Sequence, residues 1–254
     1  MNSPKIIDCS VWHGQWFLYD LRYSDLVLME KKLRALNVQN AFISPLESVF
    51  AQDPHEGNFK MLEDIKDRPF FQPAPVIDLL LANWKENIEK LYNDLKIKMI
   101  RLIPNFHTYE LTEESLEELV QFTAPRNIII AIPMRMEDSR GQSPLLKEPM
   151  ELPIAGVAKA LSFYPQQKFI LNNVYWHEVN DLYHILGNTL FDIAMMEPVN
   201  PLKAIKEKYS IERFVFSSNC PFFYPEGNWN KLSYSDISEE DILKIASENI
   251  EKLI

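Results

Sequence analysis

The apolar residues of this chain fall into eight short runs, and amphipathic stretches separate them. Most of the runs are rich in Ile, Val, Leu or Phe, as is typical of parallel strands that are buried on both faces. Eight such strands with helices between them predict an α/β fold, a single (β/α)8 TIM barrel over residues 1–254. The predicted strands are Lys5–Cys9, Asn40–Ser44, Ala74–Asp78, Lys98–Ile103, Asn127–Pro133, Lys168–Asn173, Thr189–Met195 and Arg213–Ser218.

Helical periodicity follows most of the predicted strands. In the first such stretch Leu26, Met29 and Leu33 share one face, and Asp25 before them is a good N-cap. The predicted helices cover 24–36, 86–95, 112–120, 153–164, 179–186, 201–209 and 238–253. Two polar or proline-rich stretches, Pro45–Pro73 and Arg135–Pro153, follow the second and fifth strands. We expect them to be loops at the C-terminal face of the barrel, where TIM barrels carry their functional residues.

Composition and charge narrow the classes of partner. The net charge of −10 argues against nucleic acid, because nucleic-acid binders carry a basic face. Two cysteines, Cys9 and Cys220, imply no disulfide framework. The N-terminus lacks the apolar core of a signal peptide, and no run approaches the roughly 20 apolar residues of a membrane span. We expect a cytoplasmic protein that binds a small-molecule ligand or substrate, and homo-oligomerisation stays open.

Common enzyme motifs are missing from the sequence. We find no G-x-G-x-x-G, no P-loop, no H-E-x-x-H and no G-x-S-x-G. The chain has only 6 glycines beside 17 prolines, which leaves little room for a glycine-rich phosphate loop. The sequence therefore predicts no nucleotide cofactor.

Four segments resemble one known family. The segment Ile7–Gly14, IDCSVWHG, is similar to a first-strand pattern I-D-x-H-x-H-x-G. Tyr164–Asn173 resembles Y-P-x-x-K-F-x-L-x-H, Arg213–Phe222 resembles R-x-x-F-G-S-D-x-P-F, and Glu248–Ile250 resembles a terminal G-N-A. These patterns belong to the amidohydrolase superfamily of metal-dependent TIM-barrel hydrolases, which the chain resembles over most of its length.

The resemblance implies metal-ligand positions whose usual ligands are replaced. Ser10 and Trp12 stand at the two histidines of the first strand, Asn173 at the histidine of the sixth, and Asn219 at the aspartate of the eighth. A His-x-His pair grips one ion because residues two apart on a strand face the same side. Serine is a poor ligand and tryptophan is none. We therefore expect no metal cofactor, and the family's metal-hydroxide mechanism is not carried over.

Several polar residues at the expected barrel mouth remain candidates for chemistry. Asp8 is the family's own aspartate, expected to face inward as a catalytic or a structural carboxylate. Trp12 either plugs the space of the ion or forms an aromatic wall for a ligand. Arg101 on the fourth strand needs a carboxylate partner or an anionic ligand, since an unpaired buried cation is costly.

The loop after the fifth strand contains a cluster of opposite charges. Arg135, Glu137, Asp138 and Arg140 lie within six residues at the C-terminal end of a strand. They are suited to hold a substrate carboxylate and supply a base, or they form an ion-paired loop that orders the rim. His13, His107 and His177 follow three other strands, and their convergence would create a relocated metal site.

These residues define three functional hypotheses. The first is a metal-independent hydrolase of a small ester, lactone or amide, in which a carboxylate activates water and an arginine binds a substrate carboxylate or an oxyanion. The second is an inactive barrel that binds a metabolite or a protein, and the third is a hydrolase with a relocated metal. The catalytic candidates are Asp8, Glu137, Asp138 and Asn219. The substrate-binding candidates are Trp12, His13, Arg101, His107, Arg135, Arg140, Asn173 and His177. A filled barrel mouth favours the second hypothesis, and an open polar pocket favours the first.

Overall fold

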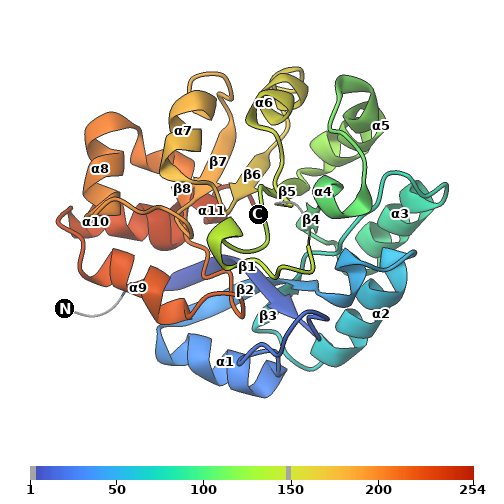
Figure 1. Cartoon of the computed structure of the whole chain (residues 1–254), viewed down its shortest axis with the longest axis horizontal. Coiled ribbons are helices and arrows are strands. Elements are labelled where there is room, and N and C mark those ends of the chain that lie inside the picture. The colour runs from blue at the N-terminus through green and yellow to red at the C-terminus, as the bar shows by residue number, and fades with distance from the viewer. Residues whose placement is uncertain (1–3, 147–149) are drawn as a thin grey trace.

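Eight strands surround a common axis in the computed structural model, and helices cover them on the outside (Figure 1). The structure describes residues 4–146 and 150–254. The predicted TIM-barrel fold is confirmed. The start of the N-terminal segment and residues 147–149 of the predicted 135–153 loop lie outside the described residues. The strands are β1 (Ile6–His13), β2 (Val38–Pro45), β3 (Phe71–Pro73), β4 (Met99–Arg101), β5 (Ile129–Pro133), β6 (Phe169–Asn172), β7 (Thr189–Asp192) and β8 (Phe214–Val215).

The strands pair in parallel as two arcs, in the orders β1-β2-β3 and β4-β5-β6-β7-β8. Backbone hydrogen bonds beyond the regular strands join the arcs. On one side, the Ile77 amide donates to the Arg101 carbonyl at 2.9 Å. On the other, the Cys9 amide donates to the Phe216 carbonyl at 3.0 Å. These bonds close the ring of strands.

The third strand lies slightly earlier than predicted. The expected segment was Ala74–Asp78, whereas β3 is Phe71–Pro73. Pro73 and Pro75 have no N–H group to donate, so regular pairing stops there. The predicted segment still contributes to the barrel wall, because the Ala74 amide donates to β2 and the Pro75 carbonyl accepts from the Arg101 amide, both at 2.8 Å.

The predicted helices are present, and the structure adds others. They are α1 (Leu26–Ala35), α2 (Pro54–Ile65), α3 (Trp84–Leu95), α4 (Pro104–His107), α5 (Glu113–Thr123), α6 (Ile154–Ser162), α7 (Trp176–Leu182), α8 (Pro201–Lys208), α9 (Pro225–Ser233), α10 (Glu239–Leu243) and α11 (Asn249–Glu251). The expectation that Pro45–Pro73 is only a loop is wrong, because α2 lies inside it. Asp53 caps α2 and Pro54 opens it, a local signal that its polar composition concealed.

The core has three parts that follow the barrel geometry. One cluster lies between strands and helices and includes Ile6, Leu33 and Ile130. A second consists of strand residues that face the barrel interior, with Ile250 of α11 packed against them. A third fills the barrel mouth at the C-terminal ends of the strands. It includes Trp12, Trp16, Leu46, Val49, Val76, Ile103, Phe106 and Met136.

A bulge in β1 changes the expected side-chain alternation. The pairing of β1 with β2 shifts register between Asp8 and Val11. Ile6 and Val11 consequently both pack in the outer cluster, although five positions separate them. Strict alternation therefore does not carry from Asp8 to Trp12, and alternation along β1 cannot support the expectation that Asp8 faces inward.

No helix of the described residues is long and apolar enough to cross a membrane.

The short helix α11 lies across the N-terminal end of the barrel, and Asn249 attaches it there. The Asn249 side-chain amide donates to the carbonyls of Ile211 at 2.9 Å and Phe214 at 2.8 Å, and the residue is buried. We predict that Asn249→Ala lowers the free energy of unfolding by about 1–3 kcal/mol, because two buried carbonyls lose their donor. Urea unfolding measures this change. The exposed Asn230→Ala is the control, and an equal loss in both variants would contradict the assigned contact.

Candidate functional site at the barrel centre

The guanidinium of Arg101 lies in a buried polar layer between the interior and mouth clusters. The residue has 0% exposure. Its Nε donates to Ser44 Oγ at 2.8 Å, and its Nη1 donates to Ser10 Oγ at 3.1 Å and Asn172 Oδ1 at 3.0 Å. Its Nη2 reaches the Cys9 carbonyl at 3.4 Å. Four neutral oxygens from the three strands β1, β2 and β6 therefore solvate this cation, in place of the water it lost.

The nearest compensating charge reaches Arg101 through Asn172. The Asn172 side-chain amide donates to Asp192 Oδ2 at 3.0 Å, and Asp192 Oδ1 accepts from the backbone amides of Asn173 at 2.9 Å and Ala194 at 3.2 Å. Burial raises the pKa of Asp192 and lowers the pKa of Arg101 to about 10. Arg101 therefore remains a cation at neutral pH. The Asn172 side chain connects it to the Asp192 carboxylate, because it accepts a hydrogen bond from Arg101 and donates one to Asp192.

Two residues at positions that the resembled family gives to metal ligands, Trp12 and Asn219, are hydrogen-bonded to each other. Trp12 Nε1 donates to Asn219 Oδ1 at 3.2 Å, and Asn219 Nδ2 donates to the Met136 carbonyl at 2.9 Å. Trp12 and Asn219 both have 0% exposure, and the Arg101 guanidinium lies 4.7 Å from the centre of the Trp12 ring. The indole thus plugs the centre of the mouth and also takes part in a cation–π contact.

These contacts show that the residues do not fit the metal of the resembled family. Ser10 Oγ accepts a hydrogen bond from Arg101, Trp12 offers no metal ligand, and the Asn219 side-chain oxygen accepts a hydrogen bond from the indole. The Asn173 side-chain amide donates to the Arg135 carbonyl at 2.7 Å. A fixed guanidinium beside Ser10 would also repel a divalent ion. In the described part of the chain, no group of three or more His, Cys, Asp or Glu side chains is placed to hold a metal.

Backbone conformation gives a separate reason for asparagine at two of these positions. Asn173 has a φ of 56° and Asn219 a φ of 50°. Both values lie in the left-handed region, which asparagine tolerates better than most residues. Each amide then hydrogen-bonds the loop after β5, Asn173 through the Arg135 carbonyl and Asn219 through the Met136 carbonyl. The two residues therefore anchor that loop over the barrel.

Asp8 is held by backbone amides beneath this layer. Its Oδ1 accepts from the amides of Ser10 at 3.2 Å and Ser218 at 2.9 Å, whereas Oδ2 has no partner in the described structure. The residue is fully buried, and this burial raises the pKa of its carboxyl to about 7. Such a pKa suits a general base, but the carboxyl has no exposed surface through which a substrate could reach it.

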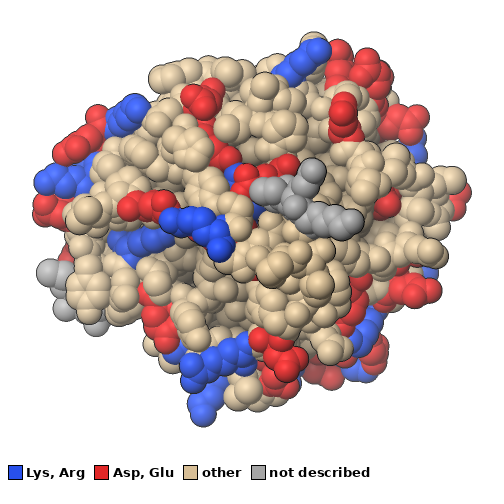
Figure 2. Space-filling model, viewed as in Figure 1, with Lys and Arg blue, Asp and Glu red and all other residues tan. Residues whose placement is uncertain are grey.

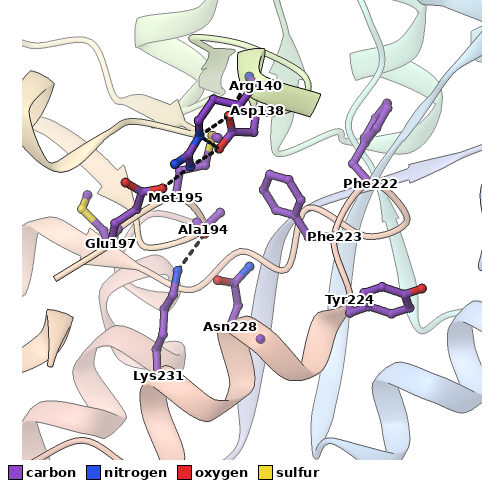
Figure 3. A pocket seen from close by; sticks show the side chains of 12 residues that line it. Asp138, Arg140, Ala194, Met195, Glu197, Phe222, Phe223, Tyr224, Asn228 and Lys231 are labelled. Atoms are coloured by element: carbon purple, nitrogen blue, oxygen red, sulfur yellow. Dashed lines mark hydrogen bonds and ion pairs between the residues drawn. The ribbon is translucent and has the colours of Figure 1, made fainter. Parts of the chain in front are cut away.

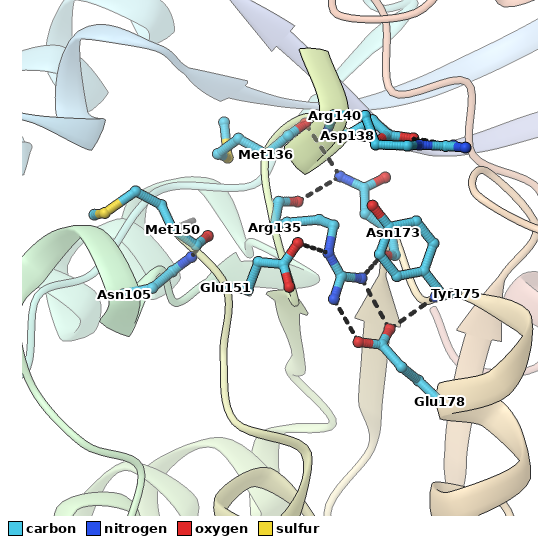
Figure 4. Close-up of polar contacts among 10 residues, drawn as sticks. All are labelled: Asn105, Arg135, Met136, Asp138, Arg140, Met150, Glu151, Asn173, Tyr175 and Glu178. Carbon is cyan, nitrogen blue, oxygen red and sulfur yellow. Dashed lines mark hydrogen bonds and ion pairs between the residues drawn. The ribbon is translucent and has the colours of Figure 1, made fainter. Parts of the chain in front are cut away.

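Arg135 forms a buried ion-pair network at the base of the loop after β5 (Figure 4). Its guanidinium binds both oxygens of Glu178, with Nη1 at 2.8 Å from Oε2, and its Nε donates to Glu151 Oε1 at 3.1 Å. Nη1 also donates to the Asn173 carbonyl at 2.6 Å, and the Tyr175 ring lies 4.0 Å from the guanidinium carbon. Four of the five N–H groups of this guanidinium thus donate to oxygens of the described residues.

The remaining charges of that loop lie nearer the surface. Arg140 Nη2 pairs with Asp138 Oδ2 and Glu197 Oε1, each at 2.5 Å, while its side chain is 71% exposed. The hydrogen bonds from Arg140 lower the pKa of Asp138. Glu137 accepts a hydrogen bond from the Tyr19 hydroxyl, and burial raises its pKa. The charge cluster seen in the sequence is therefore split, with Arg135 buried and Arg140 at the rim.

The three rim histidines have separate partners. His13 Nε2 lies 3.0 Å from Asp64 Oδ2. His107 is buried, and its Nε2 donates to the Ser48 carbonyl at 3.1 Å. His177 is exposed and stacks on the Tyr175 ring, with 5.7 Å between ring centres. The structure thus does not bring them together, and the hypothesis of a relocated metal site finds no ligand group in the described residues.

A groove of about 770 Å³ lies beside the filled centre, between the loops after β5, β7 and β8 (Figure 3). Figure 2 shows charged side chains of both signs around the edge and also in the middle of the face seen in Figure 1, with much uncharged surface between them. The groove lies off the barrel axis and has a mixed lining. It includes Arg140, Met195, Glu197, Phe223, Tyr224 and Lys231.

Sequence reasoning missed several residues of the site. Ser44 and Asn172 face the centre from β2 and β6, but no family motif emphasises them. Glu178, which pairs with Arg135, lies 43 positions away in α7. Lys231 comes from α9, a helix that was not predicted. Ser44 and Asn172 could have been found from the sequence, because each is a polar residue within an apolar run, and a polar side chain in a buried strand needs a hydrogen-bond partner.

Comparisons with known proteins find solved structures of the same fold. No protein-family model matches the chain, and no curated protein matches its sequence. The structure of an uncharacterized TIM-barrel protein from Bordetella bronchiseptica is similar, with a TM-score of 0.72, 16% identity and 98% of each chain covered. A putative amidohydrolase from Staphylococcus aureus has a TM-score of 0.74 at 13% identity, covering 98% of this chain and 99% of that one.

A third similar structure is a 5-carboxyvanillate decarboxylase from Novosphingobium aromaticivorans, complexed with manganese and a nitrobenzoic acid. Its TM-score is 0.72 at 11% identity, with 98% of this chain and 96% of that one covered. The comparisons therefore show the TIM-barrel fold that the sequence predicted. Identities this low show the fold alone, and the manganese is a property of the decarboxylase structure.

The raised pKa of Asp8 predicts a pH-dependent stability. An unfolded aspartate has a pKa of about 3.9, so the folded state holds a proton that the unfolded state has lost between about pH 4 and 7. This contribution is complete below pH 4 and is lost as the pH rises through about 7, by up to about 4 kcal/mol. Urea unfolding between about pH 4.5 and 8.5 measures how the free energy of unfolding falls as the pH rises. In Asp8→Asn this fall should be smaller by the contribution of Asp8. Asp236 is exposed, and Asp236→Asn should leave this pH dependence unchanged. If Asp8→Asn also left it unchanged, the raised pKa of the buried Asp8 would be refuted.

The two arginines of the loop after β5 should differ in stability. Arg135→Met leaves Glu178 buried without its counter-charge, which costs about 3–5 kcal/mol. Arg140→Met removes an exposed pair and should change stability little. Thermal and urea unfolding of both variants test this. Equal effects would show that the burial of Arg135 carries no energetic weight.

Proposed function

We propose that this protein is a ligand-binding barrel of the amidohydrolase-like type that performs no chemistry at its barrel centre. The observation that carries the proposal is the hydrogen bond between Trp12 and Asn219. These two former ligand positions satisfy each other, and Arg101 occupies the space beside them as a fixed cation. The centre thus serves the stability of the barrel, as a packed polar layer.

The arginines that were candidates for holding a substrate support the same proposal. Arg101 binds neutral oxygens of the barrel wall, and Arg135 binds Glu178 and Glu151. Both residues are buried, with exposures of 0% and 2%. A substrate carboxylate would have to displace these internal partners, and at Arg135 the displaced Glu178 would then be left buried without its counter-charge. Ligand recognition is better served by the rim.

The groove between the loops after β5, β7 and β8 is the place that we assign to the ligand. Its volume of about 770 Å³ is in the range of small-molecule sites, and it combines apolar walls with a few polar groups. Met195, Phe223 and Tyr224 supply the apolar surface. Glu197 and Lys231 supply the polar groups at one end, so the groove suits a small, partly apolar metabolite.

A metal-independent hydrolase is the competing function, and one observation favours it. Burial raises the pKa of Asp8 to about 7, and Asp8 Oδ2 has no partner in the described structure. A carboxylate with this pKa could take a proton from water at neutral pH. The hypothesis needs an opening of the mouth cluster, because the carboxyl is fully buried.

Two measurements separate these functions. We expect elemental analysis of the protein, purified without chelators or a metal affinity column, to find no stoichiometric zinc, manganese, iron or nickel. We also expect a screen of lactones, esters and amides to find no turnover above the level of the Asp8→Asn variant. Turnover that Asp8→Asn abolishes would establish the hydrolase, and a stoichiometric metal would overturn the structural interpretation of the centre.

A further inference from the structure

Lys231 has an unusual environment at the end of the groove (Figure 3). Its side chain reaches from α9 to the turn after β7, where Nζ donates to the carbonyls of Ile193 at 2.8 Å and Ala194 at 2.7 Å. Two of the positions on the tetrahedral nitrogen are thereby directed at the backbone, and the chain carbon takes a third. The fourth position is left for a ligand in the groove that Lys231 lines.

The charge state of Lys231 also differs from that of the surface lysines. Lys32, Lys60 and Lys66 each pair with a carboxylate, which raises their pKa values. Lys231 forms no ion pair with any of the described residues, and its two acceptors are neutral carbonyls. Burial lowers its pKa to about 8, although Asp192 and Glu197 nearby act in the opposite direction. A neutral amine can still donate two hydrogens to the carbonyls, and its lone pair then occupies the fourth position.

We propose that Lys231 is a covalent attachment point for small carbonyl compounds, aromatic aldehydes above all, which it binds as an imine. Phe223 and Tyr224 line the same groove and offer ring surfaces for an aromatic ligand. Glu197 lines it as well, with one oxygen bound to Arg140. The proposal rests on the proposed function in taking this groove as the ligand site.

The step requires no oxidant or reductant. The neutral Nζ attacks the carbonyl carbon, a C–N bond forms, and the carbonyl oxygen takes up a proton to give a carbinolamine. The nitrogen loses its protons, and the hydroxyl leaves as water when the C=N bond forms. Glu197 is the group available to accept the proton from nitrogen and return it to the departing hydroxyl. Amine and aldehyde thus give imine and water, and hydrolysis reverses the step.

Reductive trapping tests this assignment on the intact protein. The protein is incubated with benzaldehyde and sodium cyanoborohydride at several pH values, and peptide mass spectrometry measures the benzyl adduct at each lysine. An amine of pKa about 8 has a neutral fraction roughly 100-fold larger at pH 8 than a lysine with the reference pKa. We expect at least about 10-fold more adduct at Lys231 than at Lys203, an exposed lysine paired with Asp236.

The amount of benzyl adduct at each lysine of the unmodified protein decides the outcome, and no variant is needed for this. Adducts spread evenly over the lysines, or a pH profile at Lys231 that matches the profile at Lys203, would overturn the proposal. Lys231→Arg should remove the dominant adduct, and Lys203→Arg should leave it unchanged. Asp8→Asn should not alter trapping, so a failure at Lys231 is distinguishable from a discovery of turnover at the barrel centre.

Discussion

The burial of one cation constrains the centre of this barrel. Moving a guanidinium out of water costs several kcal/mol unless hydrogen bonds replace its solvation. Arg101 obtains them from Ser10, Ser44 and Asn172, all of which are fully buried themselves. Because Ser10 Oγ and Asn172 Oδ1 would lose this donor without the arginine, the layer forms as a unit. Asn172 then connects it to Asp192, so the opposite charges of β4 and β7 compensate each other across the barrel.

This layer accounts for the arrangement of the mouth above it. The indole of Trp12 lies against the guanidinium, and its N–H group is directed at Asn219. Asn219 in turn binds the Met136 carbonyl, which holds the loop after β5 over the axis. Arg135 fixes the base of the same loop through Glu178. Side chains at positions where the resembled family places metal ligands thus have a mechanical role, and the accessible surface lies to one side, in the groove.

Much of the fold was predictable from the chain itself. Strands buried on both faces must be apolar, so β5 and β6 are visible as runs of Ile, Leu and Phe. The predicted elements were wrong where residue composition suggested one structure and the prolines or capping residues favoured another. Prolines around Ala74 displaced β3, and a polar surface concealed α2 even though Asp53 marks its start. The bulge in β1 was not predictable, because it follows from pairing with β2 and changes which residues share a face.

The sequence by itself determined the barrel and placed Ser, Trp and Asn at the positions that the resembled family gives to metal ligands, since both depend on residue type and order along the chain. It could not distinguish Arg135 from Arg140, two charges five positions apart, nor single out Lys231 among the lysines. Tertiary structure decided these, because burial and partners come from strands and helices that are distant in sequence. Arg135 meets Glu178 of α7, and Lys231 of α9 meets the carbonyls after β7. In a barrel whose neighbouring strands are separated by whole helices, the chemistry of a side chain is set by these distant neighbours.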